Sequence, residues 1–128
     1  MKLIVDTHTL VWFAFDDPKL SRAARGVIEN SLNEILVSPA TYWDIAIKVA
    51  LGKWRLNLPY VELMDSLWTV YGFSVLPISP RHTARLIDMP LHHNDPFDRL
   101  LAAQSMVEGL PLVSADVVFD HYGVSRIW

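Results

Sequence analysis

Four aspartates occupy positions where a carboxylate could do chemistry: Asp6, Asp44, Asp98 and Asp116. Asp6 directly follows an apolar run, and Asp116 comes two residues after another. Carboxylates that converge on one place repel each other, and either protons or a divalent cation must relieve that repulsion. Oxygen ligands of this kind suit Mg²⁺ or Mn²⁺, with waters completing the coordination. Such a site is suited to phosphodiester hydrolysis, since the cation can activate water, orient the phosphate and stabilise the leaving oxygen.

Taken singly, these aspartates also have ordinary explanations. Asp98 lies in the first turn of an expected helix and Asp95 just before it, so one of them is expected to cap that helix, and capping does not need two. Asp44 and Lys48 are four residues apart on another expected helix, a spacing typical of a surface ion pair. Only the convergence of several carboxylates favours a metal site.

Short apolar runs alternate with helical patterns along the whole chain, and these elements must position the aspartates. We predict strands at 2–5, 34–38, 73–78, 111–114 and 124–128, and helices at 7–15, 21–30, 39–51, 61–71, 80–88, 97–108 and 117–122. This order predicts an α/β fold: a three-layer sandwich with a small, mainly parallel central sheet flanked by helices. Ligands of such sheets bind at the carboxyl ends of the strands, where Asp6 and Asp116 fall. No linker divides residues 1–128, so we expect a single domain.

Composition excludes several other classes of protein. The 128 residues contain no cysteine, which excludes a disulfide scaffold, a thiolate zinc site and a cysteine nucleophile. No apolar run approaches the 18 or so residues that span a bilayer, and the N-terminus meets Asp6 too early for a signal peptide, so we expect a cytoplasmic protein. The net charge of −3 argues against a general nucleic-acid-coating protein. Ten of the 14 acidic residues are Asp, which favours turns, caps or a site built from short carboxylates.

Four stretches together resemble a known family. They are IVDTHTLVW at 4–12, SPATYWDIAIKVALGKW at 38–54, MPLHHNDPFDRLLAAQSMVEGL at 89–110 and LPLVSADVVFDHYGVSRIW at 110–128. In this order they resemble the PIN-domain ribonucleases of the bacterial toxin type, the VapC half of a toxin–antitoxin pair. The resemblance implies a Mg²⁺-dependent endoribonuclease with a PIN-like fold. It also implies a cognate VapB-like antitoxin, an RNA substrate and a homodimer.

The resemblance assigns roles by motif. It makes Asp6 the first metal ligand, Asp98 the third acidic position and Asp116 the fourth, within a Ser-x-Asp motif. Ser114 is expected to orient the Asp116 carboxylate or to contact substrate, and Thr7 to do the same beside Asp6. The resemblance makes Asp95 a supporting or alternative acid. Apart from the resemblance, Arg99 directly follows Asp98, so it is expected to bind phosphate or to neutralise the acid cluster.

The second acidic position departs from the family pattern. Trp-Glu-Ile is usual there, whereas this chain has Trp43-Asp44-Ile45. Asp is one methylene shorter than Glu, so we expect Asp44 to reach a metal only through an intervening water. Activity is then expected to be retained but altered.

Other residues with chemical potential have competing interpretations. His8, His92 and His93 lack the spacing of a helical metal-ligand pair, so we expect ordinary satisfied or exposed histidines. Trp43 and Trp54, with Leu51, either pack in the core or line a groove for an antitoxin helix. The basic residues Lys48, Lys53 and Arg55 either contact an RNA backbone or form a solvated face.

Three alternative functions stay open at this stage. Asp6-Thr7-His8-Thr9 half matches the Asp-x-Asp-x-Thr motif of haloacid-dehalogenase-like phosphatases, but His8 replaces the second acid. A phosphate-accepting receiver domain would need an acidic pair after the first strand and a late lysine, and both are missing. In a non-catalytic PIN-like binding module, the Asp44 change would have weakened catalysis.

Overall fold

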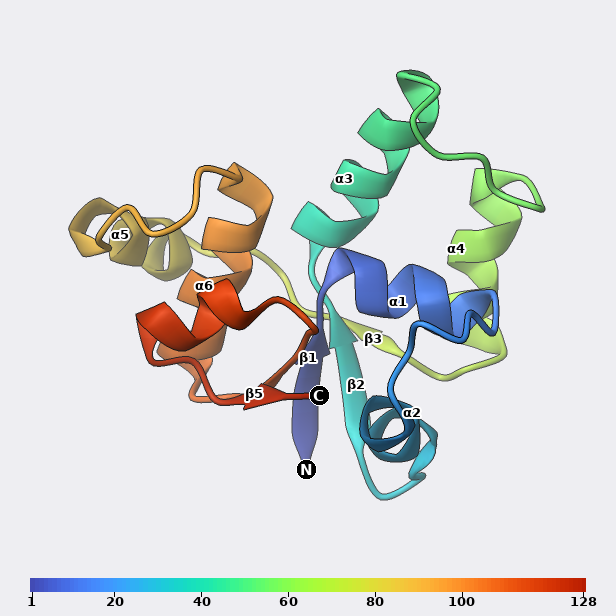
Figure 1. The fold of residues 1–128 in the computed structure, drawn as a ribbon, viewed down its shortest axis with the longest axis horizontal. Helices are drawn as coiled ribbons and strands as arrows, with labels where there is room; N and C mark the ends of the chain where they lie inside the picture. The colour runs from blue at the N-terminus through green and yellow to red at the C-terminus, as the bar shows by residue number, and fades with distance from the viewer.

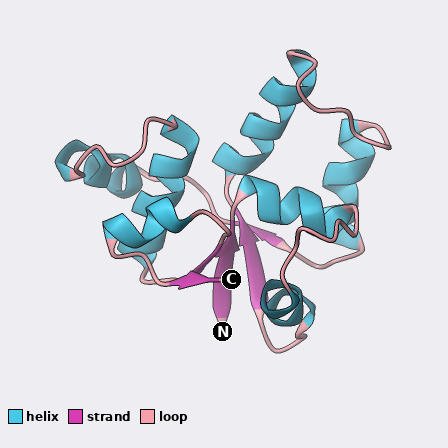
Figure 2. Ribbon diagram, viewed as in Figure 1, coloured by secondary structure: helices cyan, strands magenta, loops and turns pink.

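The structure, a computed structural model, describes all of residues 1–128. Its centre is a sheet of five parallel strands in the order β3–β2–β1–β4–β5. The strands are β1 (Lys2–Val5), β2 (Glu34–Val37), β3 (Ser74–Val75), β4 (Leu112–Val113) and β5 (Arg126–Ile127). Figure 2 shows the strands at the centre with helices to both sides. The predicted α/β sandwich is therefore confirmed, and its sheet is entirely parallel.

Six α-helices and one 3₁₀ helix connect the strands. They are α1 (Thr7–Ala14), α2 (Arg22–Glu29), α3 (Pro39–Ala50), α4 (Tyr60–Thr69), α5 (Pro80–Asp88), α6 (Pro96–Glu108) and η1 (Val117–Tyr122). The predicted caps are confirmed: the Ser21 side chain accepts from the Ala24 N–H, and Ser38 caps α3 with Pro39 in its first turn. Gly109 ends α6 with φ +65°, a left-handed conformation that favours glycine.

The two faces of the sheet build two separate cores. Leu3 and Val5 of β1 belong to a cluster of 14 buried residues, whereas Ile4 between them belongs to a cluster of nine. This alternation follows from the two-residue period of a strand. Figure 1 shows α1, α2 and α4 on one side of the sheet and α5 and α6 on the other. Both faces of β1 are covered, which explains why its apolar run is unbroken by polar residues.

The later strands are shorter than predicted. Two-residue β3 replaces the expected 73–78, and β4 and β5 are equally short. Beyond β3 the Leu76 N–H still donates to Val37, but Pro77 has no N–H to continue the ladder. The Gln104 side chain of α6 instead approaches the Leu76 and Pro77 carbonyls, at 3.4 and 3.5 Å. The predicted strands were too long because apolar residues continue beyond the residues that pair in the sheet.

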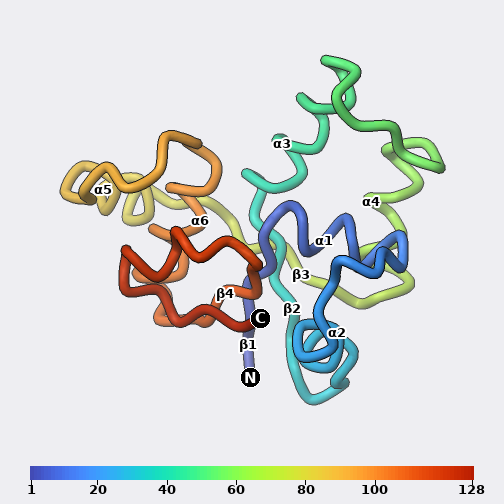
Figure 3. Tube along the Cα trace, viewed as in Figure 1, coloured from blue at the N-terminus to red at the C-terminus, as the bar shows by residue number.

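The C-terminal segment returns to the edge of the sheet. Figure 3 traces this segment, in red, on the side opposite α1 and α2. β5 pairs with β4, which in turn pairs with β1, so the chain ends beside the central strands. No helix of this structure has both the length and the apolar character needed to cross a membrane.

Candidate active site

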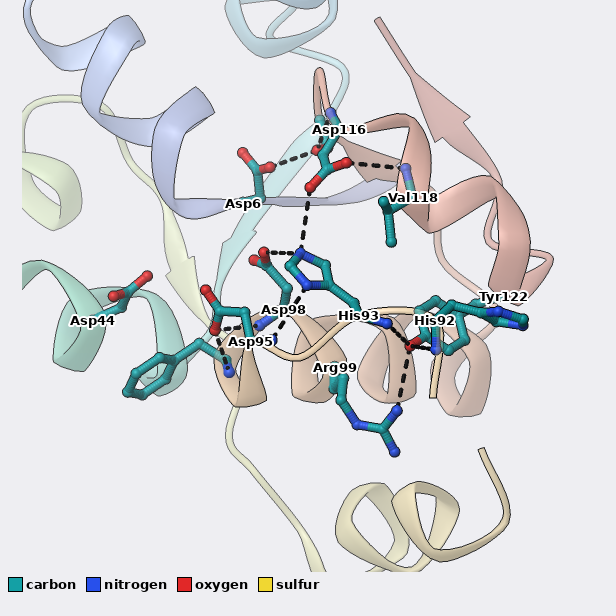
Figure 4. Close-up of polar contacts among 12 residues, drawn as sticks. Asp6, Asp44, His92, His93, Asp95, Asp98, Arg99, Asp116, Val118 and Tyr122 are labelled. Carbon is teal, nitrogen blue, oxygen red and sulfur yellow. Dashed lines mark hydrogen bonds and ion pairs between the residues drawn. The ribbon is translucent and has the colours of Figure 1, made fainter. Parts of the chain in front are cut away.

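Three of the four predicted aspartates meet at the carboxyl edge of the sheet. Asp6 follows β1, Asp116 follows β4, and Asp98 lies in the first turn of α6. Because β1 and β4 are parallel neighbours, their carboxyl ends lie side by side. Figure 4 shows the carboxylates of Asp6, Asp98 and Asp116 on the same side of the site, around the ring of His93.

Asp6 is held rigidly by its neighbours. One carboxylate oxygen accepts the Thr9 N–H at 2.9 Å, which caps α1, and the other accepts the Ser114 hydroxyl at 2.5 Å. The side chain is almost fully buried, with 5% of the residue exposed. Burial raises the pKa of Asp6 above its ordinary value, against the lowering effect of the hydrogen bonds from Ser114 and Thr9. A buried carboxylate whose two oxygens each accept a single hydrogen bond keeps lone pairs with which it can bind a cation.

Ser114 and Thr7 act differently from expectation. The Ser114 hydroxyl donates to Asp6 and accepts the backbone N–H of Asp116 at 3.0 Å, so it orients the Asp6 carboxylate rather than that of Asp116. The Asp116 carboxylate accepts the Val118 N–H at 3.0 Å and caps η1. Thr7 is buried, and its hydroxyl has no hydrogen-bond partner, so it does not orient Asp6. That task falls to Thr9 and Ser114.

Asp95 caps α6, and Asp98 faces the site; the sequence had not decided which of the two is the cap. Asp95 is the cap of α6, since its Oδ1 accepts the N–H groups of Phe97 at 2.8 Å and Asp98 at 3.4 Å. The Asp98 carboxylate is thereby left free to face the site. Its pKa is raised to about 7 by burial first, then by the charges of Asp95 and Asp6. His93 lowers that pKa and Asp116 raises it further, by smaller amounts.

His93 is the site residue that the sequence interpretation did not select. Its Nε2 lies 2.8 Å from Asp98 Oδ2 and 3.4 Å from Asp116 Oδ2. Its Nδ1 accepts the Asp95 backbone N–H at 3.2 Å, which assigns the ring proton to Nε2, facing the two carboxylates. The sequence did contain a hint, because His93 directly precedes the segment that holds Asp95 and Asp98. The spacing rule for metal ligands applies to pairs of histidines on a helix, so it does not identify a single histidine in a loop.

Asp44 lies apart from the other three carboxylates. It is buried on α3, and both of its oxygens lie 3.1 Å from Lys48 Nζ. The predicted ion pair is thus formed, but it is largely buried rather than on the surface, with the Asp44 side chain 6% exposed. Figure 4 shows Asp44 on α3, beside the cluster and without a contact to it. The short carboxylate therefore has a cation of the chain itself as its direct partner.

Arg99 does not neutralise the acids that precede it. Its guanidinium donates to the Pro90 carbonyl at 3.0 Å and to the Tyr122 hydroxyl at 3.3 Å, and it lies on the side of α6 away from the carboxylates (Figure 4). The Tyr122 hydroxyl also accepts the backbone N–H groups of His92 and His93, each at 3.0 Å. Arg99 and Tyr122 therefore hold the loop that presents His93 to the site.

The two tryptophans that the sequence left undecided have different environments. Trp43 is 62% exposed and meets Phe97 edge to face at 5.2 Å, across the gap between α3 and α6. Trp54 is half-buried and packs against the larger core cluster. Leu51 is 64% exposed at the end of α3. Trp54 therefore packs against the core, whereas Trp43 and Leu51 are exposed, and a role of these side chains in binding an antitoxin helix stays a prediction.

The donor set of the cluster fits a divalent cation. Ligand atoms of His93, Asp98 and Asp116 all lie within 4.8 Å of one another, and Asp6 is close enough to raise the pKa of Asp98. The carboxylate oxygens suit Mg²⁺ or Mn²⁺, and His93, whose Nε2 holds its proton toward Asp98 and Asp116, acts as a hydrogen-bond donor to them rather than as a ligand. Without a cation, the repulsion among these carboxylates is relieved by a proton, which Asp98 holds up to a pH of about 7.

Comparison with known proteins matches this arrangement to a family. The PIN domain family model matches residues 3–124, almost the whole chain. This chain belongs to the PIN domain family. Membership in this family leaves the phosphatase and receiver-domain alternatives without support.

Individual relatives agree with this assignment. Ribonuclease VapC22 of Mycobacterium tuberculosis (strain ATCC 25618 / H37Rv) is 25% identical over 115 residues, which cover 89% of this chain and 86% of the relative. VapBC2 from Rickettsia felis, solved bound to a DNA fragment from its promoter, matches with a TM-score of 0.69 at 13% identity, covering 100% of both chains. FitAcB from Neisseria gonorrhoeae matches with a TM-score of 0.66 at 15% identity, covering 97% of this chain and 95% of the other. At these identities the solved structures establish that the PIN domain shares their fold.

Proposed function

We propose that this PIN domain is a divalent-metal-dependent endoribonuclease that hydrolyses RNA phosphodiester bonds as the toxin of a toxin–antitoxin pair. The observation that carries the proposal is the convergence of Asp6, Asp98 and Asp116 from three elements on one edge of the sheet. A relative of similar length is named a ribonuclease, which supports RNA as the substrate class. We assign Asp6, Asp98 and Asp116 as the metal-holding carboxylates: Asp98 and Asp116 cluster with His93, and Asp6 is near enough to act on the pKa of Asp98.

The chain's own residues prepare the site for this chemistry. A divalent cation, Mg²⁺ or Mn²⁺, supplies activation of water and neutralisation of charge on the scissile phosphate. Asp6 is fixed before substrate arrives, because Ser114 and Thr9 restrain both of its oxygens. Asp98 points into the site because Asp95 performs the capping of α6. The His93 Nε2–H donates to Asp98, which keeps that carboxylate oriented. Such preorganisation is what makes electrostatic catalysis effective.

The partner proposal rests on the structural neighbours. These neighbours include VapBC2 and FitAB, each bound to DNA, together with VapBC-1 and FitAcB. We propose a cognate antitoxin of the same kind for this chain, covering the acidic edge of the sheet, and assembly as a homodimer. A toxin of this type acts where cellular RNA is found, in the cytoplasm.

One observation favours a second candidate, a PIN-like binding module with little or no catalysis. Asp44, at the position where the family usually has Glu, is engaged by Lys48 at 3.1 Å. A carboxylate that already has a cation partner contributes less to holding a metal. The three remaining carboxylates and His93 favour the nuclease over the module.

The test is cleavage of a structured RNA by the purified protein. We expect cleavage with Mg²⁺, none with EDTA, and a loss of at least about 100-fold in rate for Asp6→Asn, since a ligand carboxylate is removed at nearly constant shape. Asp65→Asn, the same change on the exposed face of α4, serves as the control and should leave the rate unchanged. Binding of RNA without cleavage under any metal would establish the module instead. Hydrolysis of a small phosphomonoester without RNA cleavage would contradict both.

A further inference from the structure

A pocket of about 410 Å³ opens between α1 and the segment that links α3 to α4. Both elements lie on the same side of the sheet (Figure 1). Aromatic rings line one part of this pocket and cations another: His8, Trp12, Phe15 and Trp54 on the first, and Lys19, Lys53 and Arg55 on the second. A volume of this size is typical of sites that take a small organic group. The carboxylate cluster does not line this pocket.

The aromatic part is a packed assembly with accessible ring surface. The His8 ring meets Trp54 edge to face at 5.3 Å and meets Trp12 at 5.5 Å. Trp12 in turn packs against Trp128 at 5.8 Å. Trp12 and Trp54 are half-buried and His8 is exposed, so the rings are held in place while one surface stays open. Rings fixed in this way are platforms on which a planar base can stack.

The cationic part has no partner within the chain. Lys19, Lys53 and Arg55 are exposed, and none of them forms an ion pair. The acid of the pocket, Asp17, has an oxygen that accepts the Lys19 backbone N–H at 2.9 Å. Three free cations beside aromatic rings contrast with a net charge of −3 for the whole chain. This local excess of positive charge favours an anionic occupant with a planar group.

The pocket borders two residues that the sequence predicted for the site, Asp6 and Asp44. His8 lies in the first turn of α1, two residues after Asp6, which caps that helix. Lys48, which pairs with Asp44, has its Nζ 4.6 Å from the centre of the Trp54 ring. The pocket therefore lies next to the first turn of the helix that Asp6 caps, and its Trp54 ring lies next to the Lys48–Asp44 pair.

We infer that this pocket is a nucleotide subsite, in which one unpaired base of the RNA stacks on Trp54 and Trp12 while Lys53 and Arg55 contact the adjoining phosphates. The inference rests on the proposed function, because it specifies how the same RNA substrate is bound. It makes unpaired RNA, rather than continuous duplex, the preferred substrate, since only a splayed base can enter the pocket.

Binding is measured with the full chain carrying Asp98→Asn, which prevents cleavage, in Mg²⁺, using a fluorescently labelled 12-nucleotide single-stranded RNA. We expect Trp54→Ala to weaken binding by about fivefold or more, Trp54→Phe to restore most of it, and Trp68→Ala on α4 to have no effect. The double substitution Lys53→Ala, Arg55→Ala should lower the salt dependence by about one unit of slope, whereas Arg81→Ala, Arg85→Ala on α5 should not.

An abasic scan separates stacking from general loss of structure. Each nucleotide of the RNA is replaced in turn by an abasic one, and each RNA is measured with Trp54 and with Trp54→Ala. We expect one or two abasic positions to weaken binding when Trp54 is present and to have no further effect when it is absent. Additive effects at every position would overturn the inference.

The remaining outcomes distinguish this inference from the proposed function. If the unmodified protein cleaves RNA and the pocket variants bind RNA like their controls, the inference is wrong and the nuclease stands. If the protein does not cleave but shows the Trp54-dependent abasic pattern, the subsite stands and the nuclease is wrong. If Trp54→Ala weakens binding of the cognate antitoxin and leaves RNA binding unchanged, the pocket binds peptide and the inference is overturned.

Discussion

Asp98 differs from most aspartates at the start of a helix. The dipole of α6 and its free N–H groups favour a negative charge there, which ordinarily lowers the pKa of a carboxyl. Burial and the nearby charges of Asp95 and Asp6 prevail instead and raise the pKa to about 7. The cap position itself is taken by Asp95, so Asp98 gains little from the helix N–H groups. A carboxyl placed this unfavourably is a characteristic of functional sites.

At the residue scale, Asp44 gives a direct prediction. In Asp44→Glu the added methylene moves the carboxylate beyond its present position beside Lys48 and restores the usual family residue, so we expect the Mg²⁺ concentration for half-maximal RNA cleavage to change by at least about threefold. Cleavage rate against Mg²⁺ concentration measures this. Asp65→Glu on exposed α4 is the matched control. An unchanged Mg²⁺ dependence and rate would mean that position 44 has no part in the site.

At the scale of elements, two helix caps have similar chemistry and different consequences. Ser21 caps α2, far from the carboxylates, and Asp95 caps α6, which carries Asp98. Replacement of either by Ala should cost about 1 kcal/mol of folding free energy, seen as about 4 °C in Tm. Only Asp95→Ala should also reduce RNA cleavage, since it releases the first turn of α6. Equal cleavage rates for the two variants would show that the Asp95 cap has no part in positioning Asp98.

The loop between α5 and α6 is a second element with a testable role. It is anchored where the Tyr122 hydroxyl accepts the N–H groups of His92 and His93, and where Arg99 donates to Pro90. In Tyr122→Phe these two N–H groups lose their acceptor, so we expect faster amide hydrogen exchange in the loop and several-fold slower cleavage. Tyr71→Phe, at an exposed tyrosine, is the control. Unchanged exchange at His92 and His93 would show that the loop is ordered by other contacts.

At the scale of the whole molecule, the acidity is concentrated. Subtracting Asp6, Asp98 and Asp116 from the 14 acidic residues leaves 11, equal to the 11 Lys and Arg. The formal net charge of −3 therefore equals the formal charge of Asp6, Asp98 and Asp116, and the other charged residues balance one another. A bound divalent cation would bring the molecule close to neutrality and remove an electrostatic obstacle to RNA.

This concentration predicts how stability depends on pH and metal. The folded-state pKa of Asp98, about 7, lies above its ordinary value of 3.8. The stability associated with its proton is complete below about pH 4 and is lost as pH rises through 7. In EDTA we therefore expect Tm to fall between pH 5 and pH 8, and Mg²⁺ to raise Tm more at pH 8 than at pH 5. Asp98→Asn, which cannot ionise, should flatten both trends in thermal melts. Equal stabilisation by Mg²⁺ at both pH values would contradict the prediction.

The order of elements, the parallel sheet and the aspartates at its edge could be predicted from the amino-acid sequence. Apolar runs, caps such as Ser21 and the turn after β1 depend on neighbouring residues, and parallel strands then bring their carboxyl ends together. Which side chains contact one another is seen in the folded chain. Folding turned Arg99 away from the acids, directed Ser114 to Asp6 and brought His93 to Asp98, and it buried the Asp44–Lys48 pair that the spacing had predicted. Contacts between separate elements, and the burial of each side chain, depend on how those elements pack in three dimensions, which spacing along the chain does not encode.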